Sequence, residues 1–333
     1  MEPAINKMQL DTADVFELIG YDLARVEEEL TRQGESGIEP VAEIARYLQA
    51  GGGKRLRPAL HLLAANYCGY EGPSAVKLGA VLELIHTATL IHDDVIDGAT
   101  IRRGRASANR RWGNPMSVLA GDWLYMQAFR IALAERNFRI LDILSALTQT
   151  MVEGELIQLT KLGRLDVTEE EALDLSYRKT AYLFSVCMQL GALLAGKGHK
   201  EEAQLAAYGL NAGLAFQVID DLLDFVASPE RLGKPVVSDL REGKVTLPLV
   251  YALEMTDARG REKVESVLCE QGFRSVQLEE IIALVRQTGA EERTRAKAAN
   301  LAAQACRQLE SLPDSIYKRA LETVPQFILS RSF

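Results

Sequence analysis

Apolar residues recur along most of the chain at intervals of three and four, which is the period of an α-helix. Short alternating runs of valine, isoleucine, threonine and aromatic residues, which would predict strands, are almost absent. Several central stretches are apolar almost all round, as expected for helices surrounded by other helices. The pattern predicts helices at 11–34, 39–50, 55–69, 73–94, 115–135, 138–162, 168–196, 200–226, 244–256, 259–270, 276–288, 291–311 and 314–330.

Two segments interrupt the helical pattern and are predicted to be loops. Residues 227–243 are rich in proline and glycine, and residues 98–106 are rich in glycine and arginine. Thr168 and the three glutamates that follow it predict a helix start with a capping box. Because no shift in composition marks a boundary and no repeat of fixed period occurs, we expect one all-α domain over residues 1–333.

The composition, with 47% hydrophobic and 25% charged residues, is that of an ordinary globular protein. A net charge of −8 argues against a broad nucleic-acid-binding surface but leaves room for a local basic pocket. The N-terminus lacks the pattern of a secretory signal, and the longest apolar stretches are interrupted by polar residues. The four cysteines lie far apart, which predicts reduced thiols. We therefore expect a cytoplasmic protein without a stable membrane anchor.

Two similar acidic clusters each end an apolar stretch: DDVID at residues 93–97 and DDLLD at residues 220–224. Residues four apart lie on one face of a helix, so each cluster can direct at least two carboxylates to one side. Carboxylate oxygens suit Mg²⁺ together with water and substrate phosphates, and no zinc-type spacing of histidine or cysteine lies near either cluster. One such cluster could be a solvated helix end, but two favour a metal site. The candidate ligands are Asp93, Asp94, Asp97, Asp220, Asp221 and Asp224.

Basic residues that could hold phosphate groups occur in several places. In the segment GGGKRLRP, three glycines allow the backbone to approach a ligand closely, and Lys54 and Arg57 can converge on one anion. This is not a Walker A loop, because the GxxxxGK[ST] order is missing. A single lysine or arginine is usually only a solvated surface charge, but two metal-type clusters nearby predict a site for two diphosphates. The other candidates are Arg102, Arg103, Lys179, Lys234 and Lys244.

The chain resembles the trans-isoprenyl diphosphate synthases. The motifs GGGKRLRP, HTATLIHDDVIDGATIRRG, RKTAYLF, GLAFQVIDDLLDF and GKPVVSDLREGKVTLP stand in the order and spacing of that family, and the resemblance covers roughly residues 15–330. It implies a single all-α bundle around a deep central cavity, usually paired as a homodimer. It also implies a Mg²⁺-dependent reaction in which isopentenyl diphosphate adds head-to-tail to an allylic diphosphate and pyrophosphate leaves.

The resemblance also implies roles for individual residues. The direct Mg²⁺ ligands would be Asp93, Asp97 and Asp220, and the supporting acids would be Asp94, Asp221 and Asp224. The allylic diphosphate would be held by Arg102, Lys179, Lys244 and, more loosely, Lys234. The catalytic group around the allylic C1–O bond would comprise Arg102, Lys179, Thr180 and Gln217. The isopentenyl diphosphate pocket would comprise Lys54, Arg57, Arg103 and His86, which lies two helical turns before Asp93.

Small side chains one helical turn before Asp93 bear on the length of the product. Ala88 and Thr89 stand where an aromatic residue would stop the growing tail early, so we expect a tunnel that continues past Ile85, Leu82 and Val81. The HTATLIHDD wording is similar to long-chain synthases that supply ubiquinone or menaquinone side chains. At about one isoprene unit per helical turn, we expect on the order of six to ten units. Alternatively, the floor of the tunnel lies on another helix, at Met126 or Phe129.

Three other functions deserve comparison with a long-chain synthase. A short-chain enzyme of the farnesyl or geranylgeranyl type would share the same motifs. A terpene cyclase usually mixes asparagine, serine or threonine with glutamate in its second metal motif, so DDLLD argues against it. A catalytically silent partner subunit could lose its aspartates without losing its fold, whereas all six are present here.

Overall fold

The computed structural model describes residues 10–35, 37–226 and 236–331, and helices dominate this part of the chain. The elements are α1 (Thr12–Leu18), α2 (Gly20–Gly34), α3 (Glu39–Ala50), α4 (Leu56–Tyr67), α5 (Ser74–Ile96), β1 (Ile101–Arg102), β2 (Arg105–Ala106), α6 (Ala108–Trp112), α7 (Asn114–Ala134), α8 (Phe138–Lys161), α9 (Glu169–Ser176), η1 (Tyr177–Ala181), α10 (Tyr182–Leu194), α11 (His199–Val226), α13 (Ser238–Arg241), α14 (Leu247–Met255), α15 (Ala258–Glu270), α16 (Leu278–Gln287), α17 (Ala290–Leu309) and α18 (Ile316–Ser330). The all-α prediction is confirmed.

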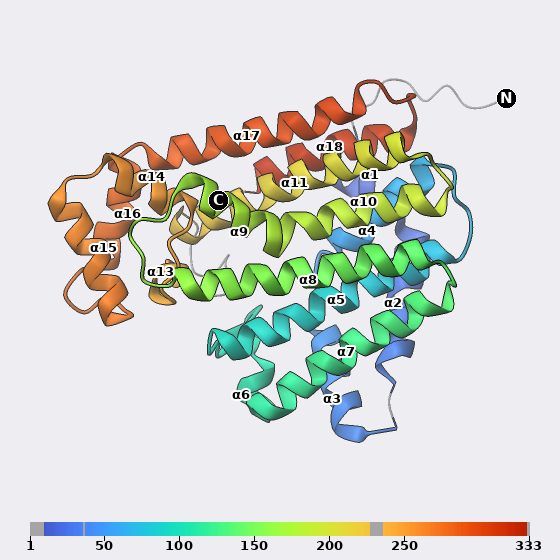
Figure 1. Cartoon of the computed structure of the whole chain (residues 1–333), viewed down its shortest axis with the longest axis horizontal. Coiled ribbons are helices and arrows are strands. Elements are labelled where there is room, and N and C mark those ends of the chain that lie inside the picture. The colour runs from blue at the N-terminus through green and yellow to red at the C-terminus, as the bar shows by residue number, and fades with distance from the viewer. Residues whose placement is uncertain (1–9, 36, 227–235, 332–333) are drawn as a thin grey trace.

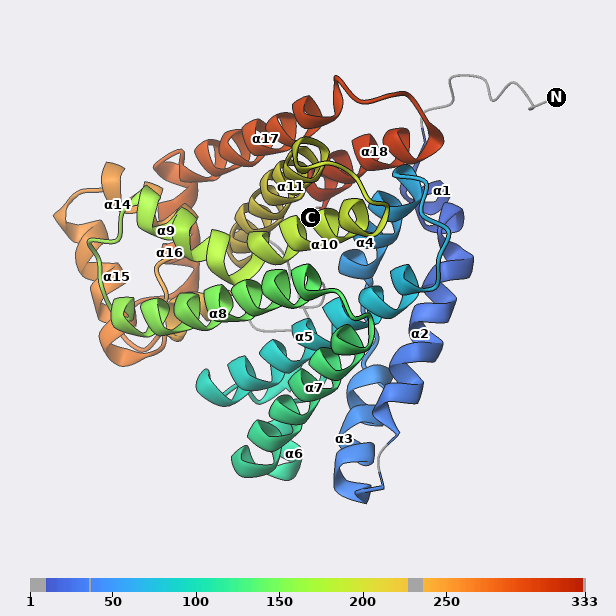
Figure 2. The same ribbon diagram turned by 45° about the vertical axis from the view of Figure 1, so that its right-hand side comes forward.

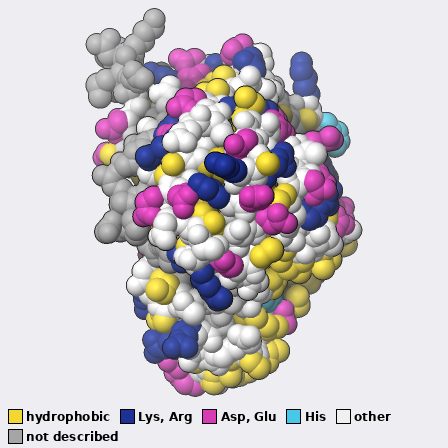
Figure 3. All heavy atoms as spheres, turned by 90° about the vertical axis from the view of Figure 1, so that its left-hand side faces the viewer, with side chains coloured by type: hydrophobic (Ala, Val, Ile, Leu, Met, Phe, Trp, Pro, Cys, Tyr) yellow, Lys and Arg dark blue, Asp and Glu magenta, His cyan; other side chains and the backbone are white. Residues whose placement is uncertain are grey.

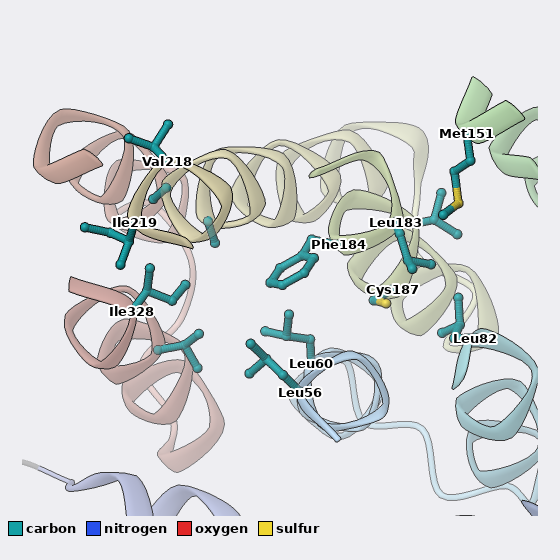
Figure 4. Close-up of a cluster of buried hydrophobic side chains, with 14 of the residues drawn as sticks. Leu56, Leu60, Leu82, Met151, Leu183, Phe184, Cys187, Val218, Ile219 and Ile328 are labelled. Atoms are coloured by element: carbon teal, nitrogen blue, oxygen red, sulfur yellow. The ribbon is translucent and has the colours of Figure 1, made fainter. Parts of the chain in front are cut away.

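The long helices α5, α8, α10, α11 and α17 run across the molecule, and α14, α15 and α16 close one end of it (Figure 1). Helix α17 packs along α11, and α7 packs along α5. Buried apolar side chains form a hydrophobic cluster that extends from Val15 to Ile328. Figure 4 shows part of it, where Phe184 of α10 faces Leu56 and Leu60 of α4. Burial of these side chains is the main source of stability in such a bundle.

Two predicted helices differ from the structure in their extent. The helix predicted at 11–34 is broken at Ile19, directly before Gly20, and glycine inside a helix is unfavourable. The helix predicted at 244–256 begins only at Leu247, where Pro248 occupies a position in the first turn that needs no N–H donor. The capping box predicted at Thr168 is present, because its hydroxyl accepts from the N–H of Glu171 at 3.2 Å.

The two predicted loops both contain short regular elements. Residues 98–106 fold into the hairpin of β1 and β2, in which Ile101 pairs with Ala106. The described end of the second loop forms α13, a single turn of helix. Both elements are too short for hydrophobic periodicity to reveal, because a helical or strand pattern needs several residues to repeat.

The helix predicted at 168–196 contains a π-helical turn, η1, between α9 and α10. Glycines on both neighbouring helices allow this turn to pack closely. A Cβ on Gly154 of α8 would lie 2.7 Å from the Cβ of Arg178, and one on Gly213 of α11 would lie 2.6 Å from the Cα of Ala181. Single π-helical turns often occur at functional sites.

The C-terminal ends of α5, α8 and α11 and the turn η1 lie at the same end of the bundle, on the left in Figure 1. Both acidic clusters are therefore at this end. Within the described ranges, α5 is the one helix long and apolar enough to cross a bilayer, and 72% of its apolar window is buried in the protein. Core helices of globular proteins pass the same test.

Candidate active site

The first acidic cluster ends α5 and is held by cations from two other segments. Arg102 of β1 donates from Nε to Oδ1 of the buried Asp94 at 2.8 Å, and its Nη2 contacts the same oxygen. Nζ of Lys244, just before α14, donates to Oδ2 of Asp97 at 2.8 Å and also pairs with Glu242. Arg102 and Lys244, two of the predicted diphosphate-binding residues, therefore lie directly beside this cluster.

Asp93 differs from its two neighbours, because no described side chain donates a hydrogen bond to its carboxylate. Burial raises the pKa of Asp93 to about 6; the charge of Lys179 opposes this, and the charges of Glu155 and Asp97 add to it. A carboxylate in such surroundings would gain from a nearby cation.

Lys179 lies on the π-helical turn between two cavities. Its Nζ pairs with Glu155 at 2.6 Å and donates to Oε1 of Gln158 at 2.9 Å, both on α8. One cavity, of about 160 Å³, is also lined by Thr180, Asp221 and Lys244. The other, of about 370 Å³ and mostly apolar, is lined by Asp93 and Thr89 together with apolar side chains of α7 and α8. A polar chamber and an apolar chamber therefore meet at this lysine.

A hydrogen-bonded chain connects η1 to the second acidic cluster. The Thr180 hydroxyl donates to Oε1 of Gln217 at 2.6 Å, and Nε2 of Gln217 donates to Oδ1 of Asp221 at 2.7 Å. Burial, followed by the charge of Asp239, raises the pKa of Asp221 well above its ordinary value. Thr180 and Gln217, which the sequence places near the reacting bond, are thus in direct contact.

The other two aspartates of this cluster have different partners. Asp220 is half-exposed and pairs with Nη2 of Arg331 at 3.3 Å. Asp224 is 1% exposed, and its carboxylate accepts from the Ser238 hydroxyl at 3.0 Å and the Asp239 N–H at 3.1 Å. Asp224 therefore holds α13 against the end of α11.

The basic segment before α4 lies close to His86. The guanidinium of Arg57 stacks over the Phe184 ring at 5.4 Å, and its Nε has no hydrogen-bond partner among the described residues. Burial and then the charges of Arg57 and Arg103 lower the pKa of His86 well below its ordinary value, so this imidazole is neutral at pH 7. Nη1 of Arg103 donates to the carbonyl of Gly52. These residues therefore form one positively charged region.

Lys54 and Arg55 stand in the same segment but have different surroundings. Lys54 is exposed and lies 5.3 Å from the centre of the Phe327 ring, and burial and the charge of Arg331 lower its pKa. Arg55 is nearly buried and pairs with Glu27 and, at 2.8 Å, with Glu83. Arg55 therefore supports the fold and does not face the region of His86 as a free cation.

The residues predicted to bear on product length lie in different environments. Thr89 lines the apolar cavity, whereas Ala88, Ile85 and Leu82 are fully buried in the hydrophobic cluster, as is Val81. Of the two alternative floor residues, the side chain of Met126 is 61% exposed and that of Phe129 packs against the core.

Three polar residues of the site were not predicted from the sequence. Glu155 and Gln158 lie three apart on α8, and this spacing on a partly apolar helix was a usable signal. Arg331, beside Asp220, lies far from every motif and has no local signal. The predicted Lys234 lies outside the described residues.

Taken together, the described residues of the site place oxygen ligands and cations at one end of an apolar cavity. This arrangement suits a polyphosphate with an apolar tail.

Comparison with known proteins gives four consistent findings. A family model described as polyprenyl synthetase matches residues 38–285. Octaprenyl diphosphate synthase of Escherichia coli strain K12 is 40% identical over 307 residues, which cover 92% of this chain and 95% of that protein. A solved decaprenyl diphosphate synthase from Rhodobacter capsulatus has a TM-score of 0.90 and 36% identity over 96% of this chain and 98% of that one. A polyprenyl synthase from Caulobacter crescentus CB15, complexed with calcium and isoprenyl diphosphate, has a TM-score of 0.91 and 35% identity, covering 98% and 99%.

Proposed function

Because the chain belongs to the polyprenyl synthetase family, we propose that it adds isopentenyl diphosphate head-to-tail to an allylic diphosphate and makes a long all-trans polyprenyl diphosphate. The chain is a long-chain prenyltransferase, and its relatives fit a role in making quinone side chains. The observation that carries this function is the meeting of the two cavities at Lys179, one polar and one apolar. A diphosphate fits the first and a growing hydrocarbon tail fits the second.

Mg²⁺ suits the carboxylates of the site. Among the described residues, no three acidic, histidine or cysteine side chains already converge as a complete ligand set. Mg²⁺ needs only one or two carboxylates, because water and substrate phosphates supply its remaining ligands. The raised pKa of Asp93 indicates a carboxylate that a cation would stabilise. We assign Asp93, Asp97 and Asp220 as ligands, with Asp94, Asp221 and Asp224 as their supports.

The cations around the first cluster would hold the allylic diphosphate. Arg102 and Lys244 hydrogen-bond to carboxylates and lie where they could also reach phosphate oxygens, and Lys179 lines both cavities. Lys234 joins them on the basis of the sequence alone. Bound Mg²⁺ would supply further positive charge to the leaving diphosphate. Charge that builds up as the C1–O bond breaks is then stabilised more than the ground state, which lowers the barrier.

The positively charged region of Lys54, Arg57, Arg103 and His86 would hold isopentenyl diphosphate. Arginine offers a fork of N–H donors to phosphate oxygens, and no described residue forms a hydrogen bond or ion pair with the guanidinium of Arg57. The double bond of isopentenyl diphosphate attacks C1 of the allylic cation, and a new C–C bond forms. The released pyrophosphate would take the proton that leaves, and the apolar lining of the cavity would limit the access of water to the cation.

We also propose that the enzyme works as a homodimer. Large apolar side chains are exposed along one face of α7 and α8, and patches of this kind usually mark an interface. Figure 3 shows hydrophobic side chains gathered at the lower right of that view. The exposed residues are Val118, Leu119, Met126 and Leu133 on α7, and Val152, Leu156 and Leu159 on α8. Four of them, Val118, Val152, Leu156 and Leu159, also line the apolar cavity, which therefore opens on this face. We expect Leu119→Glu, at an exposed residue of this face that does not line the apolar cavity, to halve the mass measured by light scattering, whereas Met255→Glu, at an exposed residue of α14, leaves the mass unchanged.

The remaining proposals concern the organisation and location of the chain. One hydrophobic cluster contains residues from both ends of the described chain, which supports a single domain over residues 1–333. The burial of α5, the helix apolar enough to cross a bilayer, supports a cytoplasmic location without a stable membrane anchor. The binding partners on this proposal are its two diphosphate substrates and a second copy of the chain.

The proposed reaction is tested by incubating the protein with Mg²⁺, labelled isopentenyl diphosphate and farnesyl diphosphate. The products are dephosphorylated and their lengths read by chromatography, with a chelator as control. We expect a Mg²⁺-dependent ladder that ends at a long polyprenol, and little product from Asp93→Asn. A product that stops after one addition would contradict the long-chain assignment, and an absence of extension would contradict the reaction itself.

A further inference from the structure

A cluster of aromatic and arginine side chains joins α3 to the β1–β2 hairpin, and we call it the Tyr47 clasp. The guanidinium carbons of Arg105 and Arg111 lie 4.1 Å and 4.8 Å from the centre of the Tyr47 ring. The Trp112 ring meets Tyr47 edge-on at 5.0 Å. The Tyr47 hydroxyl donates to the carbonyl of Ala106 at 2.7 Å, and Nη1 of Arg105 donates to the carbonyl of Tyr47 at 3.3 Å. The clasp therefore fixes both strand β2 and helix α6 to α3.

The clasp lies at the edge of the main hydrophobic core, against which Trp112 packs. Helix α3 is at the edge of the molecule in both ribbon views (Figures 1 and 2). The buried side chains of α3 are those of Ala42, Ile44 and Ala45, and Tyr47 is not among them. Cation–π contacts and hydrogen bonds at such a position orient neighbouring segments more than they add to core burial.

Two basic segments of the site continue directly from the clasp. Helix α3 ends at Ala50, and the chain then passes through residues 51–53 to Lys54 and Arg57. On the other side, the hairpin carries Arg102 at the end of β1 and Arg103 in its turn. The clasp therefore lies between the two segments assigned to isopentenyl diphosphate.

Arg103 depends on this arrangement more than Arg102 does. Arg102 is anchored independently by Asp94. Arg103 has a φ of 52°, in the left-handed region that is unfavourable for a residue with a Cβ, and its guanidinium donates to Gly52. A Cβ on Gly53 would lie 2.9 Å from Nη1 of Arg103, so the loop and the hairpin are already in close contact. A shift of the hairpin would move Arg103 relative to this loop.

We propose that Tyr47 is a positioning residue for the binding of isopentenyl diphosphate. By fixing the hairpin to α3, it sets the distance between Arg103 and the segment that carries Lys54 and Arg57. This inference rests on the proposed function, which assigns these three cations to isopentenyl diphosphate. On this proposal Tyr47 acts through Arg103, with which it lines one cavity, and not by contact with the reacting atoms.

The test compares Tyr47→Ala and Tyr47→Phe with the natural enzyme. We expect Tyr47→Ala to raise KM for isopentenyl diphosphate by roughly tenfold, because two cation–π contacts and a hydrogen bond are lost. KM for the allylic substrate should change by less than about twofold, since Asp94 still holds Arg102. Tyr47→Phe keeps the ring and should restore most of the affinity. Tyr21→Ala is the matched control, because its exposed ring lies 5.6 Å from Arg25 on α2, remote from the hairpin.

A double-mutant cycle with Arg103→Ala distinguishes failure of the inference about Tyr47 from failure of the assignment of Arg103 to isopentenyl diphosphate. If Tyr47 acts through Arg103, Tyr47→Ala raises KM for isopentenyl diphosphate no further in the Arg103→Ala background. Multiplicative effects of the two changes would overturn the inference, as would equal effects on both substrates. If Arg103→Ala alone leaves KM for isopentenyl diphosphate unchanged, the assignment of Arg103 fails, and the inference fails with it. Thermal unfolding of Tyr47→Ala and of Tyr47→Phe, which retains the ring contacts, checks that both variants keep the fold.

Discussion

Arginines of similar appearance in the sequence are distinguished by the groups that neutralise them. Arg55 is held between Glu27 and Glu83, of which Glu83 is 3% exposed. Arg57, two residues later, stacks on Phe184, and no described residue forms a hydrogen bond or ion pair with its guanidinium. The first arrangement satisfies a buried carboxylate, and the second leaves a cation available to an anionic ligand. Arg55 therefore stabilises the fold, whereas Arg57 is available for binding.

This difference predicts opposite effects of two alanine substitutions. Arg55→Ala leaves Glu83 buried without its cation, so we expect the free energy of unfolding to fall by about 3–5 kcal/mol. Arg57→Ala should instead raise KM for isopentenyl diphosphate by roughly tenfold or more, the effect expected for a lost charge-assisted hydrogen bond. Urea unfolding and steady-state kinetics on both variants distinguish the roles. A loss of stability in Arg57→Ala equal to that in Arg55→Ala would contradict the distinction.

His61 predicts a pH dependence of stability. It is fully buried on α4, where its Nδ1 lies 3.1 Å from the carbonyl of Cys187, and burial lowers its pKa to about 4. The unfolded chain, with an ordinary pKa near 6.5, binds the proton more readily, so stability falls as the pH drops below that value. Between about pH 7.5 and pH 5.5, we expect His61 to account for a loss of roughly 1–2 kcal/mol in the free energy of unfolding. Urea unfolding at both pH values should show a smaller loss for His61→Gln, and an equal loss would refute this role.

At the scale of elements, hydrophobic periodicity predicted the long helices. Their buried positions recur once in each helical turn, so the pattern is visible in the local sequence. The π-helical turn was missed because its cause is not local. It depends on Gly154 and Gly213, which lie on two other helices and remove side chains from its path. The hairpin was missed because each of its strands has two residues and no period.

The same reasoning explains which parts of the site the sequence could predict. Spacing along a helix predicted that Asp93 and Asp97 lie on one face. The family motifs predicted that Arg102 and Lys244 bind diphosphate near them. The sequence did not predict that Asp224 accepts hydrogen bonds from α13, because that contact depends on how a distant loop folds back. Arg331 reaches Asp220 from the other end of the sequence for the same reason. Contacts within a helix follow from spacing, whereas contacts between helices need the tertiary structure.

Close packing of the π-helical turn can be tested with one added methyl group. Gly213→Ala would place a Cβ 2.6 Å from the Cα of Ala181, so η1 must shift. We expect a loss of about 1–3 kcal/mol in stability, as for other overpacked sites. We also expect kcat to fall, because Lys179 and Thr180 move with the turn. Gly198→Ala is the control, since a Cβ there meets nothing within 4 Å. Unchanged kcat in a destabilised Gly213→Ala would show that the position of the turn is not critical.

At the scale of the whole molecule, charge and hydrophobicity are separated along one axis of the site. Carboxylates and cations gather where α5, α8 and α11 end, and the apolar cavity extends from Asp93 and Lys179 between α5, α7 and α8. A diphosphate must remain at the charged end while the hydrocarbon tail lengthens. The apolar cavity therefore offers the tail a route away from the reacting carbon, and this route begins beside Thr89.

The position of the apolar cavity gives different roles to Thr89 and Ala88, for which the sequence predicted the same role. Thr89 lines the apolar cavity, so Thr89→Phe should fill the start of the tail's route and shorten the product while the enzyme remains folded. Ala88 is fully buried among packed side chains, so Ala88→Phe should mainly cost about 1–3 kcal/mol of stability through overpacking. Chromatography of the dephosphorylated products and thermal unfolding of both variants measure the two effects. If a folded Ala88→Phe enzyme makes the shorter product and Thr89→Phe does not, the tail follows the face of α5 that carries Ala88, and the apolar cavity has another role.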